Sequence, residues 1–320
     1  MTETSPWVEK YRPQTIDDIV QQDEVVSALR TTLEKGDLPH LLFHGPPGTG
    51  KTSTALALCR TLFKTDIKKR LMELNASDDR GIDSVRSKIK QFASLSVPST
   101  PVPYKIIILD EADSMTRDAQ NALRRIIEQY SAVTRFIIIC NYVSKIIDPI
   151  LSRCARFRFK SLDRPSIISR LQLISNKEEL TVEGDDAFET LVDISGGDLR
   201  KAITFLQSSA AAGTITSTML REISGSPDPN AVQAFFDACI EKSWGDVEAS
   251  TLDLVYSGYD VSQILEILCN IVIHTQSVRD ASKPQILTRI AAANGMINNR
   301  ADPEIQFKAL ASLIHTLRII

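Results

Sequence analysis

The sequence lacks the marks of several protein classes. It has no apolar run long enough to cross a membrane, and its polar start, residues 1–5, lacks the apolar core of a secretory signal. The formal net charge is only −3, so no overall positive field points to nucleic acid. Any such contact must come from a local patch or from partner subunits. With 320 residues we expect two or three domains and no membrane partner.

Cysteine is scarce, and its spacing argues against the usual cysteine chemistry. None of the five cysteines forms a C-x-x-C pair, and all stand among apolar residues in the sequence: Cys59, Cys140, Cys154, Cys239 and Cys269. This pattern favours reduced, buried thiols in an intracellular compartment over disulfides or a zinc site. We therefore expect no catalytic role for cysteine.

The most informative stretch that is present is GPPGTGKT, residues 45–52, which fits the phosphate-loop pattern G-x-x-x-x-G-K-[ST]. Apolar residues 41–43 before it predict a buried strand, and apolar spacing predicts a helix over 52–62. In that setting backbone N–H groups surround phosphate oxygens, Lys51 reaches the β and γ phosphates, and the Thr52 hydroxyl is placed for Mg²⁺. The alternative is a glycine-rich turn that binds nothing, and the strand-loop-helix order argues against it.

A second buried strand is predicted over 104–109, followed directly by Asp110 and Glu111. Open α/β sheets bind ligands at the carboxyl ends of their parallel strands. Asp110 would hold Mg²⁺, mainly through water, and Glu111 would polarise the attacking water. An exposed acidic turn explains either motif alone, but both motifs in this order predict ATP hydrolysis. A further strand over 134–140 ends at Asn141, which could bond the γ-phosphate or simply cap the strand.

A basic face is predicted on the helix that begins at residue 82. Arg86 and Lys90 are four residues apart and share a face, and Arg80 stands near the helix start. These cations could hold nucleic-acid phosphates. A solvated basic face explains the same pattern, and the residues alone favour that simpler interpretation.

The remainder of the chain predicts helices without a catalytic constellation. Strand character stops after residue 162, and the loop 224–229, with one glycine and two prolines, is a good boundary. We therefore expect an α/β fold with a parallel sheet flanked by helices, then a helical lid and an all-α assembly domain. The expected domains are 1–162, 163–225 and 226–320.

Six stretches follow one another in a characteristic order: PWVEKYRP (6–13), LPHLLFHGPPGTGKTST (38–54), LMELNASDDRGI (71–82), IIILDEADSMT (106–116), CNYVSKIIDPILSRCARFRF (140–159) and GDLRKAITFLQ (197–207). Together they resemble the AAA+ ATPases, and more closely the small subunits of eukaryotic replication factor C. The resemblance covers essentially the whole chain. It implies ATP and Mg²⁺ as cofactors, and a clamp loader that places the PCNA ring on primer-template DNA. It also implies a large subunit and three other small subunits as partners, and the nucleus as the location.

The resemblance gives roles to single residues. It implies that Val8 and Arg12 contact the adenine end of ATP, that Asn141 is a first sensor, and that Arg200 is a second sensor in the lid. From its sequence position alone, Arg200 could also be a surface charge. The phosphate contacts would come from one continuous run: Gly45, Pro46, Pro47, Gly48, Thr49, Gly50, Lys51, Thr52 and Ser53.

Arg153 stands in Ser-Arg-Cys, residues 152–154, which matches the family's SRC motif. In the family this arginine reaches into the neighbouring subunit's ATP site, and such a residue can raise the rate by several orders of magnitude. The family also places the helix after residue 82 along the DNA backbone. This reverses the simpler interpretation of Arg86 and Lys90, with Arg80 a weaker candidate. The C-terminal helices would form a collar that holds five subunits in a ring.

The same motifs could also belong to a branch-migration motor or to a mainly structural ring member. A branch-migration motor of the AAA+ class shares similar motifs, but its winged-helix end would need β-strands that the C-terminal sequence does not predict. A mainly structural ring member, supplying Arg153 and the collar, would be favoured by an altered Lys51 or Glu111. Neither residue is altered. The sequence therefore predicts an ATP-hydrolysing subunit.

Overall fold

The computed structural model describes residues 5–36, 38–77, 82–95, 102–184, 186–211 and 213–317, without the side chains of 34, 35 and 82–86. The chain forms two compact units, Met1–Thr214 and Ile215–Ile320, and each is described by itself. Among the described residues, no helix combines the length and the apolar character needed to span a bilayer.

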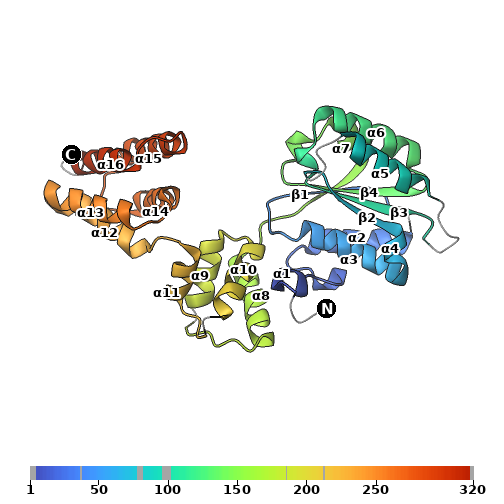
Figure 1. Cartoon of the computed structure of the whole chain (residues 1–320), viewed down its shortest axis with the longest axis horizontal. Coiled ribbons are helices and arrows are strands. Elements are labelled where there is room, and N and C mark those ends of the chain that lie inside the picture. Colours follow the sequence, from blue (N-terminus) through green and yellow to red (C-terminus); the bar gives the residue numbers. More distant parts are fainter. Residues whose placement is uncertain are drawn as a thin grey trace. The chain divides into compact units, whose positions relative to one another are not determined.

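The first unit is built on five parallel strands in the order β2-β3-β4-β1-β5 (Figure 1). Their bounds are β1 (His40–His44), β2 (Leu71–Asn75), β3 (Lys105–Asp110), β4 (Thr134–Cys140) and β5 (Cys154–Arg158). Strands β3 and β4 are continuous apolar runs because both faces of this sheet are covered. The predicted α/β fold with a parallel sheet is confirmed.

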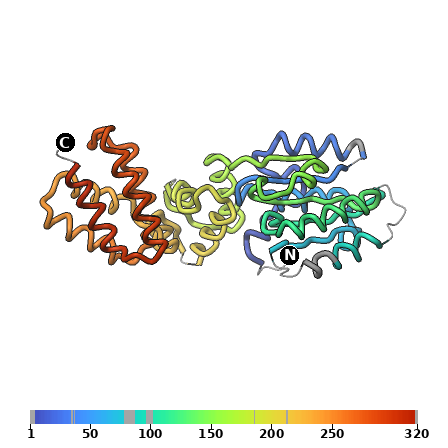
Figure 2. Tube along the Cα trace, turned by 90° about the horizontal axis from the view of Figure 1, so that it is seen from above, coloured from blue at the N-terminus to red at the C-terminus, as the bar shows by residue number. Residues whose placement is uncertain are grey.

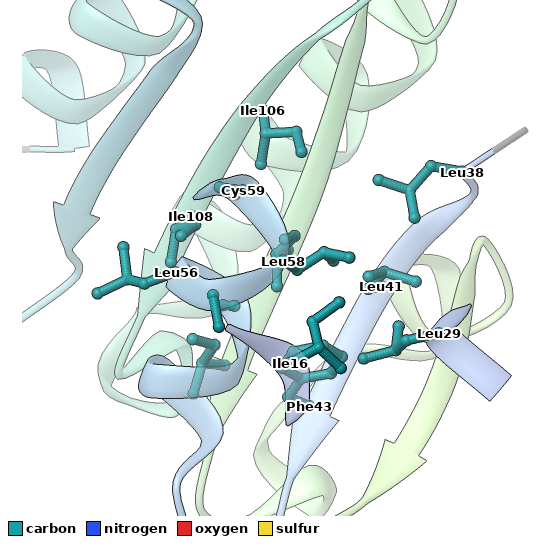
Figure 3. Packing of buried hydrophobic residues seen from close by; sticks show 14 of the residues in the cluster. Ile16, Leu29, Leu38, Leu41, Phe43, Leu56, Leu58, Cys59, Ile106 and Ile108 are labelled. Carbon is teal, nitrogen blue, oxygen red and sulfur yellow. The ribbon is translucent and has the colours of Figure 1, made fainter. Parts of the chain in front are cut away.

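Helices cover the sheet on both faces, and alternate side chains of each strand enter separate cores. Leu41 and Phe43 of β1 pack with α3 and α2, whereas Leu42 between them packs with α5 and α6 on the other face. Figure 3 shows the first of these cores, where Leu56 and Leu58 of α3 meet the strands. The helices of this layer system are α2 (Asp23–Lys35), α3 (Lys51–Phe63), α4 (Ile67–Arg70), α5 (Ile82–Ser94), α6 (Arg117–Tyr130) and α7 (Asp148–Leu151).

Shorter elements complete the first unit. Its N-terminal arm carries helix α1 (Trp7–Lys10), and four short 3-10 helices lie in the connections: η1 (Ile16–Asp18), η2 (Lys64–Asp66), η3 (Ala112–Ser114) and η4 (Val143–Lys145). After the sheet follow α8 (Arg164–Lys177), α9 (Asp186–Ser195) and α10 (Leu199–Ala210). The Asp198 side chain accepts a hydrogen bond from the Arg200 N–H at 2.8 Å, so Asp198 is the N-cap of α10.

The regular elements among the described residues of the second unit are all helices. Its helices α12 to α16 lie side by side (Figure 2) around one apolar core that includes Phe236, Leu268 and Phe307, each fully buried. Their bounds, with the preceding α11, are α11 (Ser217–Ser224), α12 (Pro229–Glu241), α13 (Trp244–Tyr256), α14 (Val261–His274), α15 (Lys283–Asn298) and α16 (Pro303–Leu317). This agrees with the all-α end expected from the sequence.

All five cysteines carry free thiols; Cys59, Cys140 and Cys239 are buried as predicted, whereas Cys154 and Cys269 are only partly buried. Burial raises the pKa of Cys140 and of Cys154 to about 12, so both are protonated at neutral pH. Since the thiolate is the reactive form, these residues are inert packing groups.

The buried Lys105 explains how α5 ends against the sheet. Its ammonium group donates to the carbonyl oxygens of Phe92 at 2.5 Å and Ala93 at 3.3 Å, and to that of Leu95. The last carbonyls of a helix have no partner within the helix and carry partial negative charge. Lys105 supplies the partner from β3, and this joins helix and strand.

We predict that Lys105→Met lowers the free energy of unfolding of the first unit by about 1–3 kcal/mol, because these carbonyls lose a charged donor inside the protein. Urea unfolding followed by circular dichroism measures the change. Lys69→Met is the matched control, since Lys69 is exposed on α4. Equal effects of the two substitutions would show that Lys105 contributes no more than a surface lysine.

Candidate functional site

The candidate site lies at the edge of the sheet where β1, β3 and β4 end. The loop 45–50 leaves β1 and enters α3, which begins at Lys51. It approaches other residues so closely that a side chain at either of two glycine positions would collide with them. A Cβ at Gly45 would lie 2.2 Å from the carbonyl oxygen of Phe159, and one at Gly48 would lie 2.2 Å from Oδ1 of Asp198.

Lys51 is buried beneath this loop, with 7% of its surface exposed. Its Nζ donates to the carbonyl oxygens of Gly45 at 2.8 Å and Pro46 at 2.7 Å, and to Oδ1 of Asn141 at 3.0 Å. Burial lowers the pKa of Lys51, although the nearby Asp110 carboxylate opposes this. A buried cation with uncharged nearest partners is suited to bind an anion, and the N-terminus of α3 adds positive potential.

Thr52 and Asp110 join α3 to β3. The Thr52 hydroxyl donates to Oδ2 of Asp110 at 2.6 Å, while Oδ1 of Asp110 accepts from the Glu111 N–H at 2.8 Å. A hydroxyl and a carboxylate are hard oxygen ligands of the kind that Mg²⁺ prefers, and they leave room in its coordination shell for water and phosphate. The residues therefore fit a magnesium ion.

Glu111 stands beside this pair. Its exposed side chain lines a cleft that Lys51, Thr52 and Asp110 also line. Its backbone has φ of 53°, the left-handed conformation that residues other than glycine rarely adopt. The Ser114 hydroxyl holds it there by donating to the Glu111 carbonyl at 2.7 Å. Strained backbone of this kind persists where the surroundings fix a functional side chain.

Asn141 follows β4 and meets Lys51, as the Oδ1 contact shows. Its own position is fixed by Asp113, whose Oδ2 accepts from the N–H groups of Asn141 at 3.3 Å and Tyr142 at 3.2 Å. No motif in the sequence predicts this role for Asp113. The available signal was its place as the last acid of the Asp-Glu-Ala-Asp run.

These residues line a cleft of about 240 Å³ together with the arm and the lid helices. Val8 and Arg12 line it from the arm, Arg200 lines it from α10, and residues 47–53 line it from the loop and the start of α3. Gly45 and Pro46 lie outside this lining and act instead through their carbonyl oxygens on Lys51. The structure thus brings together most of the residues expected around ATP.

Part of the cleft wall was missed by sequence reasoning. The arm and η1 region contribute Tyr11, Ile19 and Val20, and α10 contributes Leu199 and Ile203. Mostly apolar walls with a few polar groups are typical of sites for small organic ligands. Leu199 and Ile203 are four residues apart and so share one face of α10, a spacing that could have placed them.

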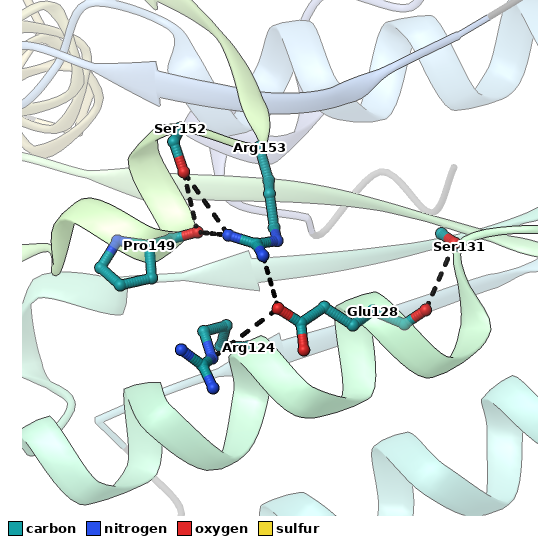
Figure 4. A network of polar contacts seen from close by, with 6 residues as sticks. All are labelled: Arg124, Glu128, Ser131, Pro149, Ser152 and Arg153. Atoms are coloured by element: carbon teal, nitrogen blue, oxygen red, sulfur yellow. Dashed lines mark hydrogen bonds and ion pairs between the residues drawn. The ribbon is translucent and has the colours of Figure 1, made fainter.

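Arg153 lies elsewhere on the first unit, outside the described lining of the cleft. Figure 4 shows its guanidinium group directed at Glu128 of α6, with Arg124 one turn earlier. Nη2 lies 2.5 Å from Oε1 of Glu128, and Nη1 donates to the Pro149 carbonyl at 2.7 Å. The side chain remains 39% exposed.

The three predicted DNA contacts are covered only in part. Lys90 is exposed on α5, whereas the side chain of Arg86 and the whole of Arg80 lie outside the described residues. An exposed lysine agrees with either a phosphate contact or a solvated face.

Family models match three successive parts of the chain. They are the ATPase family associated with various cellular activities at 41–162, the RCF1/5-like AAA+ ATPase lid domain at 169–211, and the Replication factor C C-terminal domain at 227–312. The sheet, the phosphate loop and the lid thus define an ATPase of the AAA+ class.

Similar proteins of known family identify the family within the AAA+ class to which the chain belongs. Replication factor C subunit 4 of Arabidopsis thaliana is 48% identical over 320 residues, covering 97% of this chain and 94% of the relative. Subunit 2 of Oryza sativa subsp. japonica is 46% identical, with the same coverage. Subunit 4 of Homo sapiens is 44% identical, covering 97% of this chain and 87% of the relative. The chain belongs to the replication factor C small-subunit family, as the motifs predicted, and is an ATPase subunit of a clamp loader.

A solved structure of the RuvB Holliday junction branch migration motor of Thermotoga maritima has a TM-score of 0.54 to this chain. The two chains are 17% identical, and the match covers 80% of this chain and 90% of the RuvB chain. At this identity the likeness shows the fold alone. The second unit forms no strand among its described residues, unlike the strand-containing end expected of a branch-migration motor.

We predict that Gly48→Ala weakens MgATP binding more than tenfold and destabilises the first unit, because the new methyl group meets Asp198. Gly197→Ala is the matched control. Its φ of 79° resembles the 72° of Gly48, but a Cβ there meets no atom within 4 Å. The control should lose only about 1–2 kcal/mol of stability from backbone strain. Similar losses in both variants, by calorimetry and urea unfolding, would mean that the Asp198 contact is unimportant.

Proposed function

We propose that this chain binds and hydrolyses ATP with Mg²⁺ as one subunit of a heteropentameric clamp loader in the nucleus. Its partners would be a large subunit, three other small subunits, the PCNA ring and primer-template DNA. The observation that carries the proposal is the Thr52–Asp110 pair beside the buried ammonium of Lys51. It puts side chains that can bind Mg²⁺ next to a side chain that can bind phosphate, at one edge of the sheet. We also propose three domains, 1–162, 163–225 and 226–320, a division that the three family-model matches support.

Phosphate binding would use groups that the loop already presents. The Lys51 ammonium would leave the carbonyl oxygens of Gly45 and Pro46 and bind the β and γ phosphates. The backbone N–H groups of residues 48–53 would surround phosphate oxygens. Val8 and Arg12 would border the adenine, and Arg200 would approach the γ-phosphate from α10. The side chain of Arg200 is exposed, so it could turn toward a bound γ-phosphate.

Hydrolysis would depend on three neighbouring side chains. Thr52 and Asp110 would hold Mg²⁺, which when bound neutralises charge on the phosphates. Glu111 would accept a hydrogen bond from the attacking water and so orient it toward the γ-phosphate. Asn141 would bond the same water or the γ-phosphate, and its contact with Lys51 would then report which nucleotide is present.

Arg153 would complete a neighbouring subunit's site. Arg153 lies outside the described lining of the chain's own cleft, so it is not placed to contact a nucleotide bound beside Lys51. This position supports a role in a neighbouring site. The alternative is a mainly structural ring subunit that supplies Arg153 and collar contacts. The intact arrangement of Lys51, Asp110 and Glu111 favours hydrolysis at this site.

We predict that Lys51→Ala and Arg153→Ala both impair ATP hydrolysis but differ in their effect on MgATP binding. Both should lower DNA-stimulated ATPase turnover of the reconstituted five-subunit complex with PCNA by tenfold or more. In the full chain alone, Arg153→Ala should leave MgATP affinity unchanged and Lys51→Ala should abolish it. Each variant thus controls for the other. Turnover and clamp loading that are indifferent to both substitutions would support the structural alternative instead.

The proposed DNA contact of Lys90, with Arg86 and the weaker candidate Arg80 on the same segment, predicts a change in salt dependence. Lys90→Ala should reduce the slope of log affinity against log salt for primer-template binding by the complex by about one. Lys68→Ala, at an exposed lysine of α4, is the control. A slope that is unchanged by Lys90→Ala would restore the interpretation of a solvated face.

A further inference from the structure

We infer that Glu178, at the end of α8, is a positioning residue for the base side of the nucleotide site. It holds Tyr11 of the N-terminal arm as a wall of the cleft. This inference rests on the proposed function, because it concerns the same cleft. It adds a residue that lies outside every motif singled out in the sequence.

Arg170 of α8 and Glu178, the residue that follows this helix, hold Tyr11 by its backbone carbonyl and its hydroxyl. The Tyr11 hydroxyl donates to Oε1 of Glu178, and the Tyr11 carbonyl accepts from Nη2 of Arg170 at 2.7 Å. Arg170 and Glu178 are eight residues apart, so they stand two turns apart on one face of the helix. Tyr11 and Arg170 both line the cleft.

The Glu178 carboxylate also draws in the neighbouring residue of the arm. Oε1 of Glu178 lies 2.5 Å from Nζ of Lys10, and the Glu178 side chain is only 16% exposed. Burial raises the pKa of Tyr11, and its bond to Glu178 adds to this, so the hydroxyl stays protonated as a donor. A mostly buried carboxylate with two donors is screened less by salt than a surface ion pair.

A second link binds the arm to the lid helices. The Trp7 N–H donates to Oε1 of Gln207 on α10 at 2.9 Å. Val8 and Arg12, which line the cleft, stand in the same short arm. The base side of the cleft is therefore assembled by arm and lid together. The phosphate side is formed by the loop and the strand ends, and Arg200 is the residue of α10 proposed to act there. Glu178 should act on the first side without touching the second.

The test separates the two sides with two ligands. Binding of MgATP and of magnesium tripolyphosphate, which has no base, is measured by calorimetry on the full chain. Glu178→Ala should raise the Kd of MgATP about three- to tenfold and leave that of tripolyphosphate within about twofold. Glu183→Ala, at an exposed carboxylate of the same region, is the control and should change neither.

A double-mutant cycle tests the coupling to Tyr11. Tyr11→Phe should weaken MgATP binding in the wild-type background and have little further effect in Glu178→Ala, because the shared hydrogen bond is already lost. Additive effects would overturn the inference, as would equal losses for MgATP and tripolyphosphate or no loss for either. If Lys51→Ala retains MgATP binding, the proposed function fails instead.

Discussion

The buried ammonium group of Lys51 is the contact on which the site depends. It joins the loop after β1, through two carbonyls, to the end of β4, through Asn141. This is possible because β1 and β4 are adjacent parallel strands, so their carboxyl ends meet at one edge. The cation is removed from water and has only uncharged nearest partners. The site is thereby prepared for an anion, since a phosphate would offer the missing negative charge.

The two sides of the cleft come from different parts of the first unit. Residues at the strand ends and in the loop form the phosphate side, whereas the arm and the lid helices form the other, apart from Arg200 of α10, which is proposed to approach the γ-phosphate. One close contact joins the sides, because Gly48 of the loop packs on Asp198, the N-cap of α10. Arg200 begins the same helix. A change in the loop would therefore pass directly to the helix that carries the second sensor candidate.

Features that depend on local sequence could be predicted. The apolar run of β3 followed by two acids, the phosphate loop and the Asp198 cap each follow from a few neighbouring residues. The contact of Tyr11 with Glu178 joins residues 167 positions apart, so no local pattern predicts it. Asp113 was missed for a similar reason, because its partners follow another strand. Long-range side-chain pairs thus determine what the motifs leave open.

Lys51 and Arg153 differ in a way that bears on assembly. Lys51 is enclosed by its own subunit, whereas Arg153 keeps 39% of its side chain exposed and is held by Glu128 at the surface. Exposed ion pairs contribute little stability, so loss of the Arg153–Glu128 pair would cost little. If Arg153 completes a neighbouring subunit's site as proposed, the chain carries parts of two sites. Hydrolysis would then require the ring.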